Sequence, residues 1–276
     1  MKLATIRTAD GTRAVRVDGD DLVDLGAADL GDFLAREDWK DAAAAATDVV
    51  GSASDAEYAT LVAQPSKVVC VGLNYATHIT EMGRPLPEYP TLFHKFSDTL
   101  IGANDPIARP EETEQFDWEA ELVVVIGKPV RRAKGKEAEE AIAGFTVMND
   151  ITCRDWQFRT REWSQGKNWD ASTPVGPVMV TPDELPGGIR PALAITTHVD
   201  GELMQNDNTG DLVHDPVFLV EYVSTMIRLN PGDMIASGTP GGVGHARKPA
   251  VYLQVGQEVS CAIEGIGSVT NKVVAG

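Results

Sequence analysis

Residues 119–126 carry the sequence Glu-Ala-Glu-Leu-Val-Val-Val-Ile, in which acidic and apolar residues alternate before a run of five apolar residues. This order predicts a strand that begins at a polar edge and continues into a hydrophobic core. Side chains two apart in a strand point the same way, so Glu119 and Glu121 face one side. Two carboxylates side by side at the border of a core repel each other and need a compensating group. The alternative is a strand end at the surface with ordinary exposed carboxylates.

The rest of the pattern predicts an α+β fold with a mixed, largely antiparallel sheet. Residues 2–25 alternate around two turns and predict a small meander, while the Ala-rich residues 29–50 and then residues 58–62 predict helices. Gln64-Pro65-Ser66 is the candidate boundary between a small N-terminal domain, 1–65, and a larger domain, 66–276. Further predicted elements are strands at 68–72, 145–148 and 234–236, helices at 76–82, 136–143, 154–164 and 216–226, a hairpin at 194–205 and strands in the last thirty residues.

Composition excludes several classes of function. The 276 residues are 43% apolar and 24% charged, as in an ordinary globular protein. A formal net charge of -17 argues against a nucleic-acid partner, which would need clustered Lys and Arg. No apolar run approaches the length of a membrane span, and the N-terminus lacks the apolar segment of a signal peptide. The three isolated cysteines predict reduced side chains in a cytoplasmic protein.

A third carboxylate favours a metal site over surface carboxylates at 119 and 121. Asp150 follows the predicted strand at 145–148, again where an apolar run meets polar chain. Three carboxylates without a His or Cys cluster form a hard-oxygen site that suits Mg²⁺ or Mn²⁺. Zinc would prefer imidazole or thiolate ligands, and the chain has no His-x-x-x-His pair.

His78 and Glu81 are three residues apart on the predicted helix at 76–82, so they are neighbours on one helix face. A carboxylate beside an imidazole orients the ring and raises its basicity, which is how a general base is built. Without context, an ordinary surface pair is the more frequent explanation of this spacing.

Two further stretches contain groups that suit an anionic substrate. Arg154 and Gln157 share a helix face directly after Asp150, where they could hold a carboxylate or a developing oxyanion, although Arg154 could equally pair with acidic neighbours. The glycine-rich residues 237–244 lack the Gly-Lys-Ser/Thr ending of a phosphate-binding loop. They predict a close-approach loop at a substrate site or a mere tight turn. No Gly-x-Ser-x-Gly elbow of a serine hydrolase is present.

Taken in order, these pieces resemble the fumarylacetoacetate hydrolase family, over nearly all of the chain from about residue 67 onwards. The stretches that carry the likeness are VGLNY at 71–75 with His78 and Glu81, FHK at 93–95, EAEL at 119–122, ND at 149–150, RD at 154–155 with Gln157, GK at 166–167 and GTPGGVG at 238–244. The resemblance implies a mixed β-roll catalytic domain, a homodimer, and a small accessory α/β domain at the N-terminus.

The resemblance also assigns roles to individual residues. Glu119, Glu121 and Asp150 match the metal ligands, for Mg²⁺ or Mn²⁺ with Ca²⁺ as a substitute. His78 and Glu81 match the dyad that activates water. The residues that match positions steadying or facing the substrate are Lys167, Arg154, Gln157, Lys95 and Thr239.

The function that this likeness implies is metal-dependent hydrolysis of a carbon–carbon bond in an acylpyruvate, with a small 2-oxo acid as the substrate and pyruvate enolate stabilised by the metal and Lys167. The same metal enolate would serve an oxaloacetate-type decarboxylase or an isomerase of 2-hydroxyhepta-2,4-diene-1,7-dioate. The alternative from another class is a protein that binds a metal and a small acid without turnover.

Overall fold

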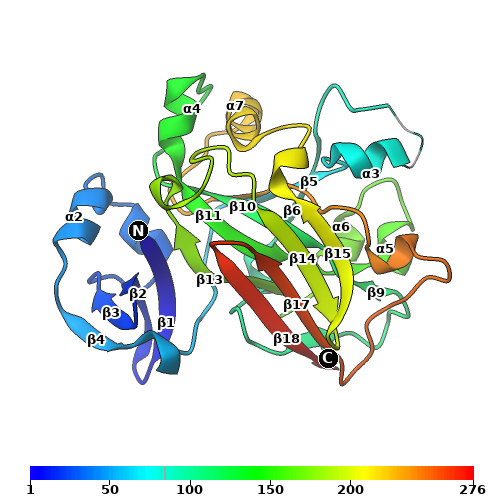
Figure 1. Cartoon of the computed structure of the whole chain (residues 1–276), viewed down its shortest axis with the longest axis horizontal. Helices are drawn as coiled ribbons and strands as arrows, with labels where there is room; N and C mark the ends of the chain where they lie inside the picture. The colour runs from blue at the N-terminus through cyan, green and yellow to red at the C-terminus, as the bar shows by residue number, and fades with distance from the viewer. Residues whose placement is uncertain (82, 84) are drawn as a thin grey trace.

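The computed structural model of the chain describes residues 1–81, 83 and 85–276. Its strands are β1 (Lys2–Thr8), β2 (Gly11–Asp18), β3 (Asp21–Asp24), β4 (Val49–Ser52), β5 (Val68–Gly72), β6 (Thr91–Lys95), β7 (Leu100–Ile101), β8 (Ile107–Arg109), β9 (Phe116–Asp117), β10 (Ala120–Ile126), β11 (Ile142–Asn149), β12 (Thr152–Cys153), β13 (Thr173–Val180), β14 (Ala194–Val199), β15 (Glu202–Asn208), β16 (Met234–Ala236), β17 (Glu258–Ile263) and β18 (Gly267–Ala275) (Figure 1). Its helices are α1 (Leu30–Leu34), α2 (Trp39–Ala45), α3 (Ala76–Glu81), α4 (Lys136–Ala141), α5 (Arg154–Gln157), α6 (Ser164–Lys167) and α7 (Pro216–Met226).

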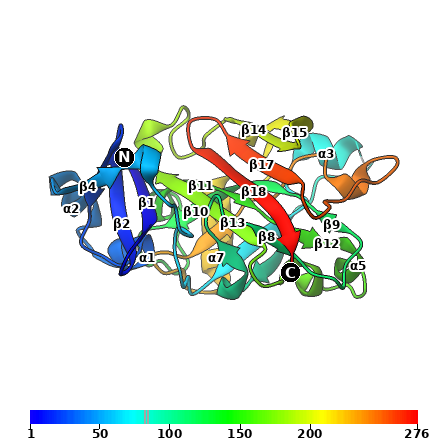
Figure 2. The same cartoon turned by 90° about the horizontal axis from the view of Figure 1, so that it is seen from below.

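Most strands belong to one large mixed sheet with the order β4-β3-β2-β1-β13-β11-β10-β16-β5-β6, which β7 joins by pairing with β13. A second sheet has the order β15-β14-β17-β18-β8 and lies across the first (Figure 2). The pairs β16–β5, β13–β7 and β18–β8 are parallel, and the other pairs are antiparallel. This sheet-dominated architecture confirms the predicted α+β class.

Strand β10 runs through the centre of the large sheet and is buried on both faces. Leu122, Val124 and Ile126 belong to the apolar cluster that includes residues of the second sheet, whereas Val123 and Val125 belong to the cluster that includes α1 and α2. A strand covered on both sides is expected to be apolar throughout, which explains the continuous run at 122–126. The start of this strand, where the run begins, is therefore held rigidly by the core.

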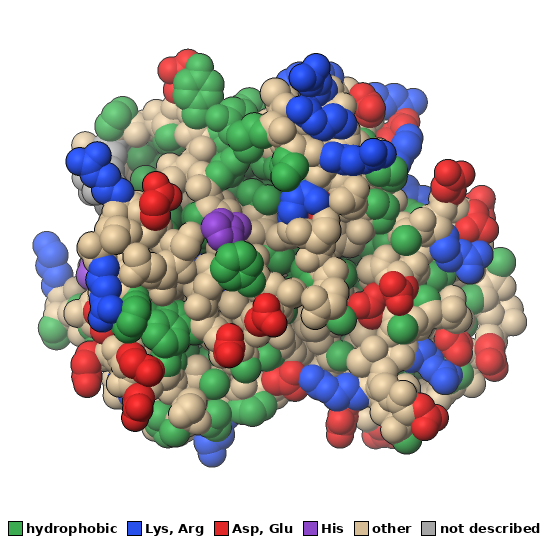
Figure 3. Space-filling view, turned by 180° about the vertical axis from the view of Figure 1, so that it is seen from behind, with side chains coloured by type: hydrophobic (Ala, Val, Ile, Leu, Met, Phe, Trp, Pro, Cys, Tyr) green, Lys and Arg blue, Asp and Glu red, His purple; other side chains and the backbone are tan. Residues whose placement is uncertain are grey.

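The N-terminal meander continues the large sheet. β1 pairs antiparallel with β13, with Leu3 opposite Met179, so residues 1–65 and the rest of the chain share one sheet (Figure 1). The division into two domains at residue 65 stays a prediction. None of the helices in the described ranges is long and apolar enough to cross a membrane. Acidic and basic side chains are interspersed on the back face of the molecule (Figure 3).

Three predicted helices differ from the structure. The Ala-rich segment forms two short helices, α1 and α2, followed by strand β4, because a short helix depends on the side chains it buries more than on alanine content. Residues 58–62 form no helix; instead Tyr58 bridges Ile6, and the carbonyl of Leu61 accepts a hydrogen bond from Thr5 Oγ1 (2.7 Å). The predicted helix at 154–164 is divided into α5 and α6.

The predicted hairpin at 194–205 and the helix at 216–226 are confirmed. β14 and β15 form the hairpin. α7 begins at Pro216, and the carboxylate of Asp215 caps it by accepting hydrogen bonds from the backbone N–H groups of Val217 (2.8 Å) and Phe218 (3.0 Å). An acidic N-cap followed by proline is a strong local signal for a helix start.

Candidate active site

Three carboxylates meet where β10 begins and β11 ends. The two strands are antiparallel, with Ala120 opposite Asn149, so Glu119 and Glu121 lie beside Asp150. The backbone N–H of Asp150 donates to the carbonyl of Glu119 (2.8 Å). All three side chains are buried, and one oxygen of each lies within 4.8 Å of an oxygen of the other two. Two carboxylates on one side of a strand and the register of the neighbouring strand therefore build this cluster.

Buried cations neutralise two of the carboxylates. Lys167 Nζ donates to Glu119 Oε2 (2.6 Å) and to Asp150 Oδ2 (2.6 Å). Lys95 Nζ lies 2.8 Å from Asp150 Oδ1, and Arg154 Nη2 lies 2.7 Å from Glu119 Oε1. Although burial raises the pKa of Asp150, Lys167 and Lys95 outweigh it and bring the pKa to about 2. Burial alone would lower the pKa of Lys167, but Asp150 and Glu119 raise it above its usual value.

Glu121 has a different environment. Its Oε2 accepts a hydrogen bond from the backbone N–H of Gly238 (2.9 Å), and within the described residues it takes part in no ion pair. Burial, then the charges of Asp150 and Glu119, raise the pKa of Glu121 well above its usual value. An additional cation between the three carboxylates would offset this repulsion. Oxygen donors at this spacing suit a hard divalent ion, so the residues present fit Mg²⁺ or Mn²⁺.

Asp117 organises the other side of the cluster. Its carboxylate is fully buried. Oδ1 accepts hydrogen bonds from the backbone N–H groups of Trp118 (2.9 Å) and Gly244 (2.7 Å). Oδ2 accepts from Arg154 Nε (2.8 Å) and from the backbone N–H of His245 (2.9 Å). Asp117 thus joins the glycine-rich loop to the guanidinium that contacts Glu119. Asp117 was not predicted as a site residue, because the local sequence holds no signal for such long-range hydrogen bonds.

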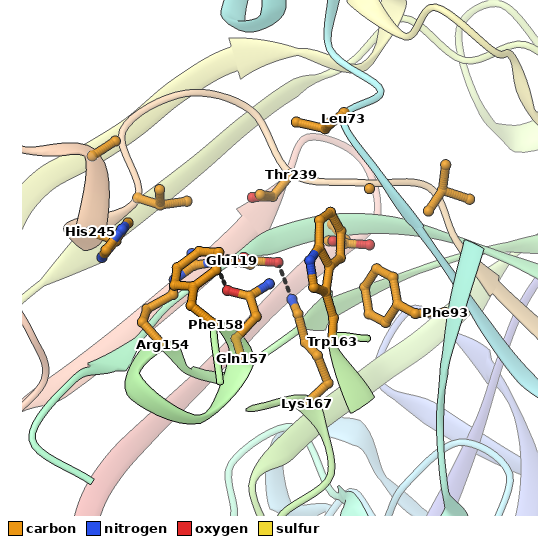
Figure 4. Close-up of a pocket in the computed structure, with 15 residues that line it drawn as sticks. Leu73, Phe93, Glu119, Arg154, Gln157, Phe158, Trp163, Lys167, Thr239 and His245 are labelled. Atoms are coloured by element: carbon orange, nitrogen blue, oxygen red, sulfur yellow. Dashed lines mark hydrogen bonds and ion pairs between the residues drawn. The ribbon is translucent and has the colours of Figure 1, made fainter. Parts of the chain in front are cut away.

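Two carboxylates of the cluster, Glu119 and Glu121, line a cavity of about 310 Å³ (Figure 4). Its polar lining includes Glu119, Glu121, Arg154, Gln157, Lys167 and Thr239, six of the residues assigned from the sequence. The Oε1 atom of Gln157 accepts a hydrogen bond from Arg154 Nη1 (3.0 Å), and Thr239 Oγ1 accepts one from Gln205 Nε2 (2.8 Å). The volume suits a small organic acid.

The other assigned residues lie elsewhere. Lys95 and Asp150 do not line the cavity; they lie against each other behind Lys167. For Lys95 this placement differs from the predicted contact with substrate, and its ammonium group holds Asp150 instead. His78 and Glu81 belong to α3, but their side chains lie outside the described residues.

Aromatic walls are the part of the site that sequence reasoning missed. Phe93, Phe158 and Trp163 line the cavity, and Lys167 Nζ lies 4.9 Å from the centre of the Phe93 ring. Trp163 packs directly against Gly72, where an added Cβ would lie 2.3 Å from a ring carbon. In the sequence, aromatic residues do occur near Lys95 and Lys167. This pattern alone does not distinguish the wall of a cavity from the hydrophobic core.

Comparison with known proteins places this geometry in a family. The fumarylacetoacetate (FAA) hydrolase C-terminal family matches residues 67–274. The chain belongs to the fumarylacetoacetate hydrolase family. The chain is 44% identical over 223 residues to oxaloacetate tautomerase FAHD2B, mitochondrial, of Bos taurus, which covers 80% of this chain and 70% of that protein.

Two solved structures of this family are similar to the whole fold or most of it. Fumarylacetoacetate hydrolase from psychrophilic Exiguobacterium antarcticum has a TM-score of 0.87 at 32% identity, and the match covers 100% of both chains. Fumarylpyruvate hydrolase from Pseudomonas aeruginosa, in complex with Mn²⁺ and pyruvate, has a TM-score of 0.67 at 34% identity over 76% of this chain and 90% of that one. These relatives are enzymes, and this chain is an enzyme of the fumarylacetoacetate hydrolase family.

Proposed function

We propose that this enzyme catalyses metal-dependent proton transfer on a short 2-oxo acid, and that its reaction is keto–enol tautomerisation of a 2-oxo dicarboxylic acid such as oxaloacetate. The observation that carries the proposal is the buried group of three carboxylates with the Lys167 ammonium between two of them, at the base of a small cavity. The similarity to oxaloacetate tautomerase FAHD2B supports the choice of reaction.

The reaction requires removal of a proton from carbon 3 and stabilisation of the negative charge that moves to the oxygen on carbon 2. Bound Mg²⁺ or Mn²⁺, held by Glu119, Glu121 and Asp150, would supply Lewis-acid chemistry at the substrate's oxygens. Lys167 uses two donors on Glu119 and Asp150, and its third N–H is available to an enolate oxygen.

Gln157 and the aromatic walls complete the proposed site. Because Gln157 Oε1 accepts from Arg154, its amide nitrogen is the donor end and can orient the substrate carboxylate. Phe93, Phe158 and Trp163 exclude water from the enolate, which strengthens the contacts to Lys167. We assign the movement of the proton to His78, with Glu81 orienting its ring, as their spacing predicts.

A second candidate is hydrolysis of an acylpyruvate. The similarity to fumarylpyruvate hydrolase favours it. In this reaction His78 would take a proton from water, the resulting hydroxide would attack the distal carbonyl carbon, and the carbon–carbon bond would break to release pyruvate enolate beside Lys167. Both reactions use the same charge stabilisation, and they differ in whether water reaches the substrate.

The experiment follows the ultraviolet absorbance of enol oxaloacetate while pyruvate is measured in parallel, with Mg²⁺, with Mn²⁺ and with chelator, and repeats the pyruvate assay with acetylpyruvate. Metal-dependent loss of enol without pyruvate release supports the tautomerase. Pyruvate from acetylpyruvate supports the hydrolase, and pyruvate from oxaloacetate indicates a decarboxylase. No metal-dependent change with either substrate would contradict the proposal. The homodimer, expected from the family resemblance, is tested separately by light scattering.

A further inference from the structure

His245 lies at the end of the cavity away from Phe93, beyond Arg154 and Phe158 (Figure 4). Its backbone N–H donates to Asp117 Oδ2 (2.9 Å), the oxygen that also accepts from Arg154 Nε. The main chain of His245 is therefore fixed to the residue that organises the cluster.

The side chain of His245 is held as well. Its Nδ1 lies 3.0 Å from the hydroxyl of Tyr252, and its ring centre lies 5.2 Å from that of Phe158. Burial, and then the positive charge of Arg154, lower the pKa of His245 below its usual value, which favours the neutral ring. When the Tyr252 hydroxyl donates to Nδ1, the proton of the neutral ring is on Nε2, which then becomes a hydrogen-bond donor.

Polar groups line the cavity at both of its ends, with Arg154, Gln157 and the apolar wall of Phe158 between them. Glu119, Glu121 and Lys167 form the reacting end, and His245 stands at the mouth. A ligand that uses both must have a polar group at each of its ends. A neutral Nε2–H suits an acceptor, and a carboxylate is the strongest acceptor that a small organic acid offers.

We propose that His245 is a specificity-determining residue that binds the distal carboxylate of a 2-oxo diacid, and that Tyr252 is a positioning residue that holds the His245 ring as an Nε2 donor. This inference rests on the proposed function in taking the substrate to be a 2-oxo acid. It goes beyond that function because it states which end of the substrate the enzyme recognises and with which side chain.

The test compares two non-reacting ligands that differ only in the distal carboxylate, 2-oxoglutarate and 2-oxopentanoate. Their binding to Mn²⁺-loaded protein is measured by calorimetry for the wild type, His245→Ala, His245→Gln and Tyr252→Phe. His198→Ala, in β14 and away from the cavity, is the matched control. We expect the wild type and the control to prefer the diacid by about tenfold, as for one hydrogen bond to a charged group.

His245→Ala is expected to reduce the preference to less than twofold by weakening diacid binding, with 2-oxopentanoate binding unchanged. His245→Gln, which keeps a donor, should retain part of the preference for the diacid. Tyr252→Phe should reduce this preference several-fold. With oxaloacetate as substrate, both His245→Ala and Tyr252→Phe should raise KM and leave kcat nearly unchanged, a split that general damage to the fold would not produce.

A preference that survives in His245→Ala, or an equal loss of affinity for both ligands, would overturn the inference. Because the calorimetry needs no turnover, its outcome is independent of the reaction catalysed. If oxaloacetate is not converted but the diacid preference depends on His245, the tautomerase proposal fails while the recognition role stands.

Discussion

Replacing Glu121 by Gln should have opposite effects on the metal-free protein and on metal binding. In the metal-free protein, Glu121 is a buried carboxyl with repulsive neighbours and one hydrogen bond, from the backbone N–H of Gly238. Gln has nearly the same shape and its amide oxygen can accept that hydrogen bond. The substitution therefore removes an unfavourable charge while it removes an anionic metal ligand.

The magnitude follows from the spacing. Oxygens of Glu119 and Asp150 lie within 4.8 Å of an oxygen of Glu121. At this distance and an effective dielectric constant near 20, two unit charges repel by roughly 3.5 kcal/mol. Lys167, Lys95 and Arg154 neutralise most of this charge, so we expect a net gain of about 1–2 kcal/mol for the metal-free variant. This gain corresponds to an increase in Tm of about 2–6 °C for a chain of this size.

The pH dependence has a defined sign. Because the pKa of Glu121 is raised in the folded state, the folded protein holds this proton more tightly than the unfolded chain. The wild type therefore loses stability as pH rises from the unfolded-state pKa of about 4.3 towards the folded-state value. Gln does not titrate, so the Tm of the variant should exceed that of the wild type more at pH 8 than at pH 5.

The assay is thermal unfolding in chelator at several pH values, together with calorimetric titration of Mn²⁺. Mn²⁺ affinity should fall by about 100-fold or more, since even substitutions outside the ligand shell cost 10–100-fold. The exposed Glu140, which pairs with Lys128, provides the control Glu140→Gln. A lower Tm for metal-free Glu121→Gln together with unchanged Mn²⁺ affinity would refute both the electrostatic argument and the ligand assignment.

Three further outcomes are expected. Mn²⁺ binding should release a proton because the pKa of Glu121 is raised, so affinity should increase with pH, and the heat of binding should differ between buffers of different ionisation enthalpy. Gly72→Ala should displace Trp163, reduce kcat/KM by about tenfold or more and change tryptophan fluorescence, whereas Gly51→Ala, with its nearest contact at 3.7 Å, should not. Asp117→Asn should lower the free energy of unfolding in urea by about 2–3 kcal/mol, because the buried guanidinium of Arg154 keeps Glu119 but loses one of its two carboxylate partners; a loss below 1 kcal/mol would contradict its organising role.

The strands of the core were predictable because their signals are local. The apolar run at 122–126, the Asp-Pro start of α7 and the glycine between β14 and β15 each determine an element within a few residues. The bounds of the helices in the N-terminal region could not be predicted, since α1 and α2 are short and the surrounding structure determines where they end. Likewise, the pairing of β1 with β13 joins residues about 180 apart, and no local pattern contains it.

Part of the candidate site could likewise be predicted from the local sequence, and part could not. The spacing of Glu119 and Glu121 predicted two carboxylates on one side, and the structure brings Asp150 beside them through strand pairing. Family resemblance supplied Lys167, which lies between Glu119 and Asp150. Asp117, Trp163 and His245 carry no such signal, because their importance arises from contacts across the fold. The roles of His78 and Glu81, and the cytoplasmic location, stay predictions.

The charges of the site fit the proposal that one scaffold supports several reactions of 2-oxo acids. Lys95, Lys167 and Arg154 neutralise Glu119 and Asp150, but no cation among the described residues pairs with Glu121, so an ionised Glu121 is a surplus negative charge and its pKa is raised. This surplus is built into the strand itself and is independent of the substrate. The groups that we propose to contact the rest of the substrate lie outside β10: Phe93 comes from the edge strand β6, and Phe158, Trp163 and His245 come from loops and short helices, which vary more easily than a central strand. The carboxylate cluster therefore belongs to the central strands of the sheet, and the residues that we propose to determine specificity lie outside those strands.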